Sequence, residues 1–135
     1  MWVMTNKGFI SAVAYPGEEH PVLVRARAPG HLTEIFGEET EEIHSPRCDY
    51  AWRTIVTKTQ MKKAMDKLVD DIDYANFKDS VKDEELHDAY VGVWTEMYIY
   101  QGDVNRKLGY QNDSYYLSMS AEEQQRYRAW WEQSA

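Results

Sequence analysis

The stretch from residue 50 to residue 72, YAWRTIVTKTQMKKAMDKLVDDI, joins a predicted strand directly to a predicted helix. Its first part, up to Thr57, is rich in aromatic and β-branched residues, which favour strands. Thr57 and Gln60 form a capping-box pattern, in which each side chain can bind the backbone N–H of the other. Apolar residues then recur at steps of three and four: Met61, Ala64, Met65, Leu68, Val69 and Ile72. The pattern predicts a helix with one apolar face that begins where a strand ends.

The residues before this stretch predict three more strands, each a short run of apolar and β-branched residues. The runs cover residues 2–4, 9–15 and 22–28. Turn-forming residues link them, with Asn6 and Gly8 in the first link and Pro16 and Gly17 in the second. Because links this short join antiparallel neighbours, the sequence predicts a meander. The strand at 50–57 makes four strands in all.

A second long helix is predicted over residues 83–100. Its apolar residues again mark a single face: Leu86, Tyr90, Val93, Trp94 and Met97. Three acidic residues crowd its first turn, where the helix dipole favours negative charge. A short helix is expected at His31–Phe36, ended by Gly37. The acidic run at Glu38–Glu42 is expected to be a solvated loop, and residues 73–77 a connector.

The chain is predicted to divide into a core domain, residues 1–101, and an aromatic-rich arm, residues 102–135. The core indicates an α+β fold, with an antiparallel four-stranded sheet packed on two long helices. The arm reads as a polar loop up to about residue 117, followed by a C-terminal helix at 121–133 that opens with a second capping box. This helix carries three large aromatic residues: Tyr127, Trp130 and Trp131. They are candidates for binding a partner, with packing onto the core as the alternative.

The composition indicates a soluble, acidic, globular protein. The chain has 135 residues, with 23 Asp and Glu against 15 Lys and Arg, for a net charge of −8. This charge repels phosphate backbones, so direct nucleic-acid binding is not expected. The single cysteine, Cys48, excludes an internal disulfide and fits a reducing compartment. Since no signal peptide or membrane-spanning run is visible, the expected location is the cytoplasm.

The sequence contains no recognisable catalytic or cofactor-binding signature. It lacks the glycine-rich phosphate-binding motifs and the G-x-S-x-G pattern of α/β-hydrolases. Its four histidines show no metal-ligand spacing, and the carboxylates at Asp70, Asp71 and Asp73 lack the glycine and final glutamate of a calcium loop. We therefore predict no catalytic residue, no metal site and no cofactor, and a binding role is favoured over an enzymatic one.

Three arginines form the candidate ligand site. Arg25 and Arg27 are two residues apart on one strand, so their side chains point to the same face. If the strand that carries Arg53 is a neighbour, the three guanidinium groups meet on the sheet face opposite the helices. Such a cluster can hold a phosphate or carboxylate by forked hydrogen bonds, with salt bridges to the chain's own carboxylates as the alternative. His87 is the accompanying acid–base candidate, with His31 as a second option.

Five segments of the core have a pattern that can be recognised elsewhere. They are Gly8–Val13, Leu23–Arg27, Asp49–Tyr50, Ile72–Lys78 and His87–Trp94. Together they resemble a family of small uncharacterised proteins of bacteria, notably actinobacteria, and of their phages. The resemblance implies a fold shared over residues 1–101 and no particular activity. The residues after Gln101 look like an addition to the family's pattern.

The leading hypothesis is a non-enzymatic protein–protein interaction module, of the phage-encoded accessory or counter-defence kind. It would bind a host protein or a second copy of itself. The missing catalytic motifs, the acidic composition and the aromatic tail favour this hypothesis. A narrower form is mimicry of nucleic acid by the acidic stretches at 38–42 and 66–88. The alternative is a binding domain or hydrolase for a phosphorylated small molecule that uses the arginines.

Overall fold

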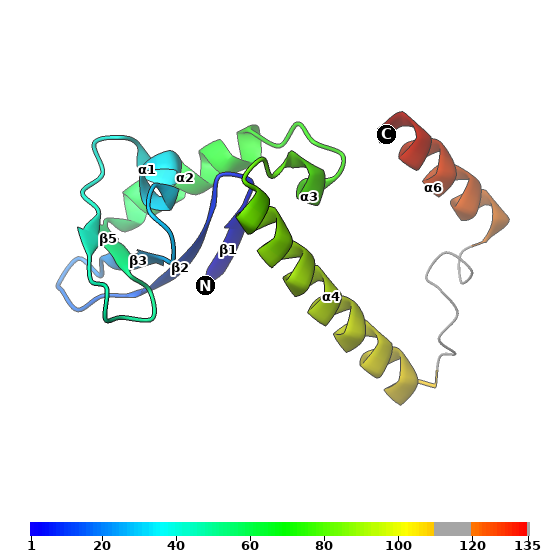
Figure 1. The fold of residues 1–135 in the computed structure, drawn as a ribbon, viewed down its shortest axis with the longest axis horizontal. Helices are drawn as coiled ribbons and strands as arrows, with labels where there is room; N and C mark the ends of the chain where they lie inside the picture. Colours follow the sequence, from blue (N-terminus) through cyan, green and yellow to red (C-terminus); the bar gives the residue numbers. More distant parts are fainter. Residues whose placement is uncertain (110–119, 135) are drawn as a thin grey trace. The chain divides into compact units, whose positions relative to one another are not determined.

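The computed structural model describes residues 1–109 and 120–134. The chain divides into two compact units, Met1–Leu86 and His87–Ala135. The first unit contains the sheet and three helices: α1 (His31–Phe36), α2 (Lys58–Asp70) and α3 (Phe77–Ser80). The second unit contains α6 (Ala121–Ser134) and all but the start of α4 (Glu84–Lys107), as Figure 1 shows.

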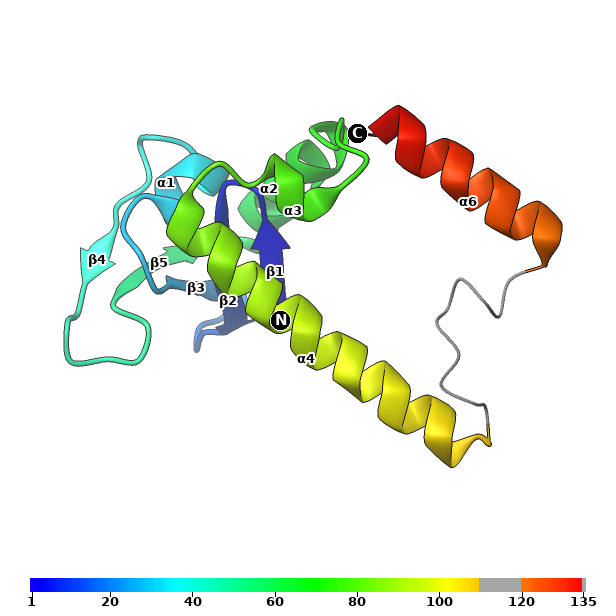
Figure 2. The same ribbon diagram turned by 45° about the vertical axis from the view of Figure 1, so that its right-hand side comes forward.

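The first unit is built on one antiparallel sheet with the strand order β1–β2–β3–β5–β4. The strands are β1 (Trp2–Thr5), β2 (Gly8–Ala14), β3 (Val22–Ala26), β4 (Ile43–His44) and β5 (Trp52–Val56). The first three follow one another as the predicted meander, and β5 adds to β3 (Figure 2). The predicted α+β class with an antiparallel sheet is confirmed.

The predicted number of strands is too low by one, because β4 lies at an edge of the sheet. Its two residues, Ile43 and His44, pair with Arg53 and Trp52 of β5. The rings of His44 and Trp52 stack with their centroids 4.6 Å apart. A two-residue strand shows no periodicity in the sequence, so only its neighbour defines it.

Helices α1 and α2 cover one face of the sheet and build the hydrophobic core with it (Figures 1 and 2). The buried cluster contains Ile10, Ala12, Val24, Ala26, Leu32, Ile35, Val56, Met61 and Ala64. The predicted capping box at the start of α2 is confirmed. Thr57 Oγ1 accepts a hydrogen bond from the Gln60 N–H at 3.0 Å, and Gln60 Oε1 accepts one from the Thr57 N–H at 2.8 Å. Helix α2 therefore begins at the predicted residue.

The acidic run at 38–42 was expected to be only a solvated loop, but one of its residues also caps a helix. The Glu42 carboxylate accepts hydrogen bonds from the backbone N–H groups of Gly30 at 3.3 Å and Thr33 at 3.4 Å. The N-cap residue of α1, Gly30, provides no side-chain cap of its own. A negative charge at a helix N-terminus is favourable, so Glu42 caps α1 from the next loop.

The apolar face of α2 is shorter than its sequence pattern predicts. Met61 and Ala64 are buried, whereas Val69 and Ile72 are 65% and 57% exposed. The helix ends at Asp70, so Ile72 lies outside it. The next residue, Asp71, fastens this end of the helix to the β1–β2 turn, because Lys7 Nζ lies 2.8 Å from Asp71 Oδ2. An ion pair thus replaces the expected last apolar contacts.

Replacing Asp71 by asparagine is expected to destabilise the first unit in a pH-dependent way. The hydrogen bond from Lys7 is the main cause that holds the pKa of Asp71 below its ordinary value of 3.8. A carboxylate whose pKa is lowered by folding stabilises the fold above its unfolded pKa, and the contribution is lost as the pH falls through the lowered value. The difference in the free energy of unfolding between the wild type and Asp71→Asn, measured with urea, should be largest at about pH 6 and should shrink towards about pH 2.

The matched control is Asp70→Asn, one residue away. Asp70 is exposed and forms no ion pair or side-chain hydrogen bond with the described residues. Its removal near a helix C-terminus should leave stability unchanged or raise it slightly. An equal loss for Asp71→Asn at both pH values would contradict the role of the ion pair.

Two regions after α2 differ from their predictions. Phe77–Ser80 forms the short helix α3 at the end of the expected connector, and Asn76 Oδ1 caps it by accepting from the Lys78 N–H at 3.1 Å. Helix α4 continues to Lys107, past the predicted end at Tyr100, so the first part of the expected polar loop is helical. Polar residues on an exposed helix look like loop residues in a sequence.

The C-terminal helix α6 is confirmed, and so is the capping box that opens it. The Ser120 N–H donates to Glu123 Oε2 at 2.8 Å, and the Glu123 N–H donates to Ser120 Oγ at 3.3 Å. Residues 110–117 of the predicted polar arm lie outside the described part of the chain.

Candidate functional site

The three candidate arginines, which we call the arginine cluster, meet on the sheet face opposite the core, which we call the open face. The register of β2, β3 and β5 places Ser11, Arg25 and Arg53 side by side in one row. Arg27 follows one residue after the end of β3. The condition for the predicted cluster, that the strands of Arg25 and Arg53 are neighbours, is met.

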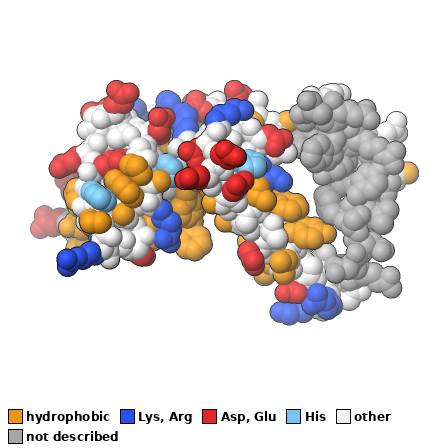
Figure 3. Space-filling model, in the orientation of Figure 1, with side chains coloured by type: hydrophobic (Ala, Val, Ile, Leu, Met, Phe, Trp, Pro, Cys, Tyr) orange, Lys and Arg blue, Asp and Glu red, His pale blue; other side chains and the backbone are white. Residues whose placement is uncertain are grey.

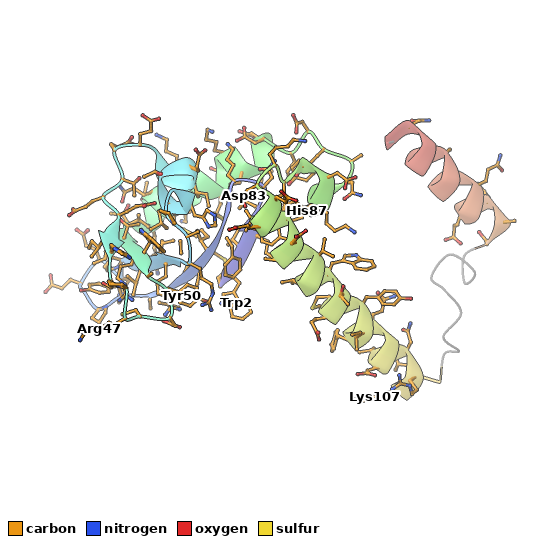
Figure 4. The ribbon with its side chains drawn as sticks, viewed as in Figure 1. Trp2, Arg47, Tyr50, Asp83, His87 and Lys107 are labelled. Carbon is orange, nitrogen blue, oxygen red and sulfur yellow. The ribbon has the colours of Figure 1, made fainter. Side chains whose placement is uncertain are left out.

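The ring of Tyr50 lies against two of these arginines. The sequence did not indicate this contact, because it predicted Tyr50 only as the first residue of a strand. The Cζ atoms of Arg25 and Arg27 lie 4.6 and 4.2 Å from the centroid of its ring. Guanidinium groups this close to an aromatic ring gain cation–π attraction. Tyr50, which Figure 4 labels, is only 4% exposed, so its ring is held in place by the fold. Its carbonyl oxygen also accepts a hydrogen bond from Arg53 Nη2 at 3.1 Å.

No arginine of the cluster forms an ion pair with a carboxylate in the described part of the chain. Each donates to a neutral oxygen instead: Arg25 to Ser11 Oγ at 2.9 Å, Arg27 to Asp49 O at 2.9 Å, and Arg53 to Tyr50 O. The Nε atoms of Arg25 and Arg53 are buried and have no partner among the described residues. The salt bridges considered as the alternative are therefore not formed there.

The two histidines considered as acid–base groups serve elsewhere. His31 Nδ1 accepts a hydrogen bond from the Phe9 N–H at 3.2 Å, a contact between α1 and β2. His87 lies on α4 in the second unit, with its Nδ1 3.3 Å from Asp88 Oδ1 (Figure 4). Within the described residues, His31 forms no hydrogen bond with the arginine cluster.

The α4 apolar surface is a second candidate site, which the sequence pattern assigned to the core. Six of its apolar side chains are 43–61% exposed: Val93, Trp94, Met97, Tyr98, Ile99 and Tyr100. Leu108, one residue after the helix, is 65% exposed. The rings of Trp94 and Tyr98 stack at 5.5 Å, and hydrophobic side chains line α4 in Figure 3. The signal that could have found this surface is the unbroken apolar run 97–100, which cannot all face one side of a helix.

A groove runs along this helix. It has a volume of about 390 Å³ and is lined by Trp94, Met97, Tyr98, Tyr100, Gln101 and Val104. All six residues belong to α4, so the groove follows one side of a single helix. A groove of this kind can receive side chains from a second helix.

A further hollow, of about 710 Å³, lies in the first unit beside α1, β5 and α2. Its walls include the apolar residues Ile35, Val56 and Ala64, and its rim carries charges of both signs, such as Glu34 and Lys63. No residue of the arginine cluster lines it. The mixed rim favours no ligand of a particular charge.

The remaining predicted candidates concern the tail and metals. Tyr127, Trp130 and Trp131 belong to α6, and their side chains lie outside the described residues. In the described ranges, no three His, Cys, Asp or Glu residues are placed to hold a metal ion. No described helix combines the length and the apolar character needed to cross a bilayer.

Known proteins offer no guide to the function. No protein-family model matches the chain, and neither a curated protein nor a solved structure matches it. The geometry of the arginine cluster and of the α4 apolar surface is therefore the basis for a functional assignment.

Proposed function

We propose that this chain is a non-enzymatic protein–protein interaction module and that α4 is its docking element. The observation that carries the proposal is the α4 apolar surface, with six apolar side chains exposed on one helix. Contiguous exposed apolar surface marks places where another protein binds, and Trp and Tyr dominate such contacts. The engagement of His31 in a backbone contact supports binding rather than catalysis.

Part of this surface has the spacing of a helix-pairing seam. Residues follow one another at steps of three and four: Trp94, Met97, Gln101 and Val104, with Leu108 continuing the spacing just after the helix. On a helix, such positions form one stripe, equivalent to the a and d positions of a heptad repeat. The same stripe holds most of the residues that line the groove. The surface is therefore shaped to receive another helix.

The partner that we propose is α4 of a second copy of this chain. Between Ala89 and Gly102 the helix has one charged residue, Glu96, so two copies meet there with little repulsion. The first turn of α4 is acidic, and its last turn contains Arg106 and Lys107. In a parallel pair the two acidic starts would face each other and so would the two basic ends, whereas an antiparallel pair separates these like charges. Charge therefore favours an antiparallel dimer.

Self-association of the full-length chain by light scattering is the test. The wild-type chain should have the mass of a dimer, and Met97→Glu should be monomeric at the same concentration. The association constant should fall by at least about 100-fold, because each copy would bury an unpaired carboxylate in the seam. Thr95→Glu is the matched control, because Thr95 lies on the opposite side of α4 from the seam and the substitution adds the same charge.

Two outcomes would contradict this proposal. A wild-type chain that is monomeric at every concentration overturns self-association and leaves a different protein, such as a host protein, as the partner of α4. A dimer that survives Met97→Glu but dissociates when residues 121–135 are removed would place the contact on α6.

A further inference from the structure

We propose that the arginine cluster is a binding site for a phosphate monoester carried by a small molecule. The proposal does not depend on self-association through α4. It rests on the open face of the first unit, where Arg25, Arg27 and Arg53 surround Tyr50.

The first argument is the placement of like charges. Arg25 and Arg53 are direct partners in the β3–β5 ladder. The guanidinium groups of Arg25 and Arg27 both lie against the ring of Tyr50. Like charges directly opposite one another destabilise a sheet. The chain has 23 carboxylates, yet in its described part none forms an ion pair with these arginines. An anion from outside the chain would relieve this repulsion.

The second argument is the number of unused hydrogen-bond donors. A guanidinium group has five N–H donors, and within the described residues each arginine of the cluster makes one hydrogen bond. Two Nε atoms, those of Arg25 and Arg53, are buried with no partner there. Buried polar groups in proteins are almost always satisfied, so such atoms call for a missing partner. A bound oxyanion would supply acceptor oxygens to the unused Nη–H donors directly, and to the buried Nε–H groups once the guanidinium groups turn toward it.

The third argument is that the site is held in place before any ligand arrives. Ser11 is 1% exposed and Tyr50 is 4% exposed, so the groups that position Arg25 are fixed in the fold. A preorganised site loses little freedom when it binds.

The charge and shape of the site favour phosphate over a carboxylate. The three arginines stand at three different positions, in β3, one residue after it and in β5, so a ligand that contacts all of them needs oxygens that point in several directions. A phosphate monoester is close to a dianion at neutral pH and presents three acceptor oxygens. A carboxylate has one negative charge and two oxygens in a plane, so it would leave more of the cluster unpaired.

The surroundings indicate an ester of an apolar or aromatic alcohol. Trp2, which is 73% exposed, pairs with Ser11 across the β1–β2 ladder. Val13, Leu23 and Ile55 form the row next to the arginine row. Side chains two residues apart on a strand are about 7 Å apart, which is within reach of a group attached to the phosphate. An apolar substituent would contact these side chains and gain affinity from their burial.

The test is a titration of the isotope-labelled full-length chain, followed by the NMR signals of the arginine Nε–H groups. Phenyl phosphate and inorganic phosphate are the probes, with sodium chloride at equal ionic strength as the reference. The Arg25 and Arg53 signals should shift to saturation with millimolar phenyl phosphate, and inorganic phosphate should bind about tenfold more weakly. If the two probes bind with equal affinity, the site recognises free phosphate, and the proposal that its ligand is an ester is wrong. Shifts no larger than those with chloride would overturn the site.

Paired variants complete the test. Arg25→Gln with Arg53→Gln should weaken phenyl phosphate binding by at least about tenfold. The control is Lys58→Gln with Lys62→Gln, which removes the same charge from exposed positions of α2 and should leave binding unchanged. If the arginine variant does not fold, Arg25→Lys with Arg53→Lys keeps the charge but loses the forked geometry, and should also bind several-fold more weakly. Undiminished binding by either folded variant overturns the proposal.

Discussion

Replacing Tyr50 by alanine is expected to lower the free energy of unfolding by about 3–5 kcal/mol, as for other buried aromatic residues. The ring is 4% exposed and lies against the guanidinium groups of Arg25 and Arg27. Its loss would leave a cavity and remove two cation–π contacts at once. Urea unfolding followed by circular dichroism would measure the change.

The substitutions Tyr50→Phe and Tyr50→Leu separate the two causes. Phenylalanine keeps the aromatic face, so stability and phenyl phosphate binding should stay close to those of the wild type. Leucine keeps apolar volume but no aromatic face, so it should recover part of the stability while binding stays weakened. If leucine binds phenyl phosphate as well as phenylalanine does, the ring does not position the arginines.

Replacing Gly8 by alanine is expected to cost about 3 kcal/mol through overpacking and a lost hydrogen bond. A Cβ atom on Gly8 would lie 2.6 Å from His31 Cγ and 2.7 Å from His31 Cβ. Because His31 Cβ is attached to the backbone of α1, the clash cannot be relieved by a rotation of the ring alone. The start of α1 would have to move, and the 3.2 Å hydrogen bond from the Phe9 N–H to His31 Nδ1 would break.

Gly92→Ala is the matched control for this prediction. Gly92 lies in α4, and a Cβ atom there would meet no described atom within 4 Å. Alanine in an exposed helix should stabilise the chain by up to about 1 kcal/mol. The two glycines should therefore respond with opposite signs in urea unfolding. A mild effect of Gly8→Ala would show that α1 can shift without loss.

The elements that could be predicted from the sequence are those determined by neighbouring residues. The capping box of Thr57 and Gln60 marks the start of α2, and the short links between the first three strands produce the meander. The two-residue period of β3 placed Arg25 and Arg27 on one face. These features depend on local backbone geometry, which the residue types largely determine.

The elements that were missed depend on contacts between distant residues. Strand β4 exists because β5 pairs with it, and Glu42 caps α1 from another loop. Val69 fits the apolar spacing of α2 and is nevertheless exposed, which the helical pattern cannot show. The apolar residues of α4 likewise suggested a buried face, because hydrophobic spacing is the same whether the partner is the core or another protein.

The sequence by itself determined the fold class, the starts of α1, α2 and α6, and the face on which the arginines lie. Only the tertiary structure decided that Arg25 and Arg53 are partners across two strands, that Tyr50 supports the cluster, and that neutral oxygens accept its hydrogen bonds. The physical reason is that hydrogen bonds and ring contacts act over only a few ångströms. Arg25 and Arg53 are 28 positions apart in the sequence and become neighbours only through the strand order of the folded sheet.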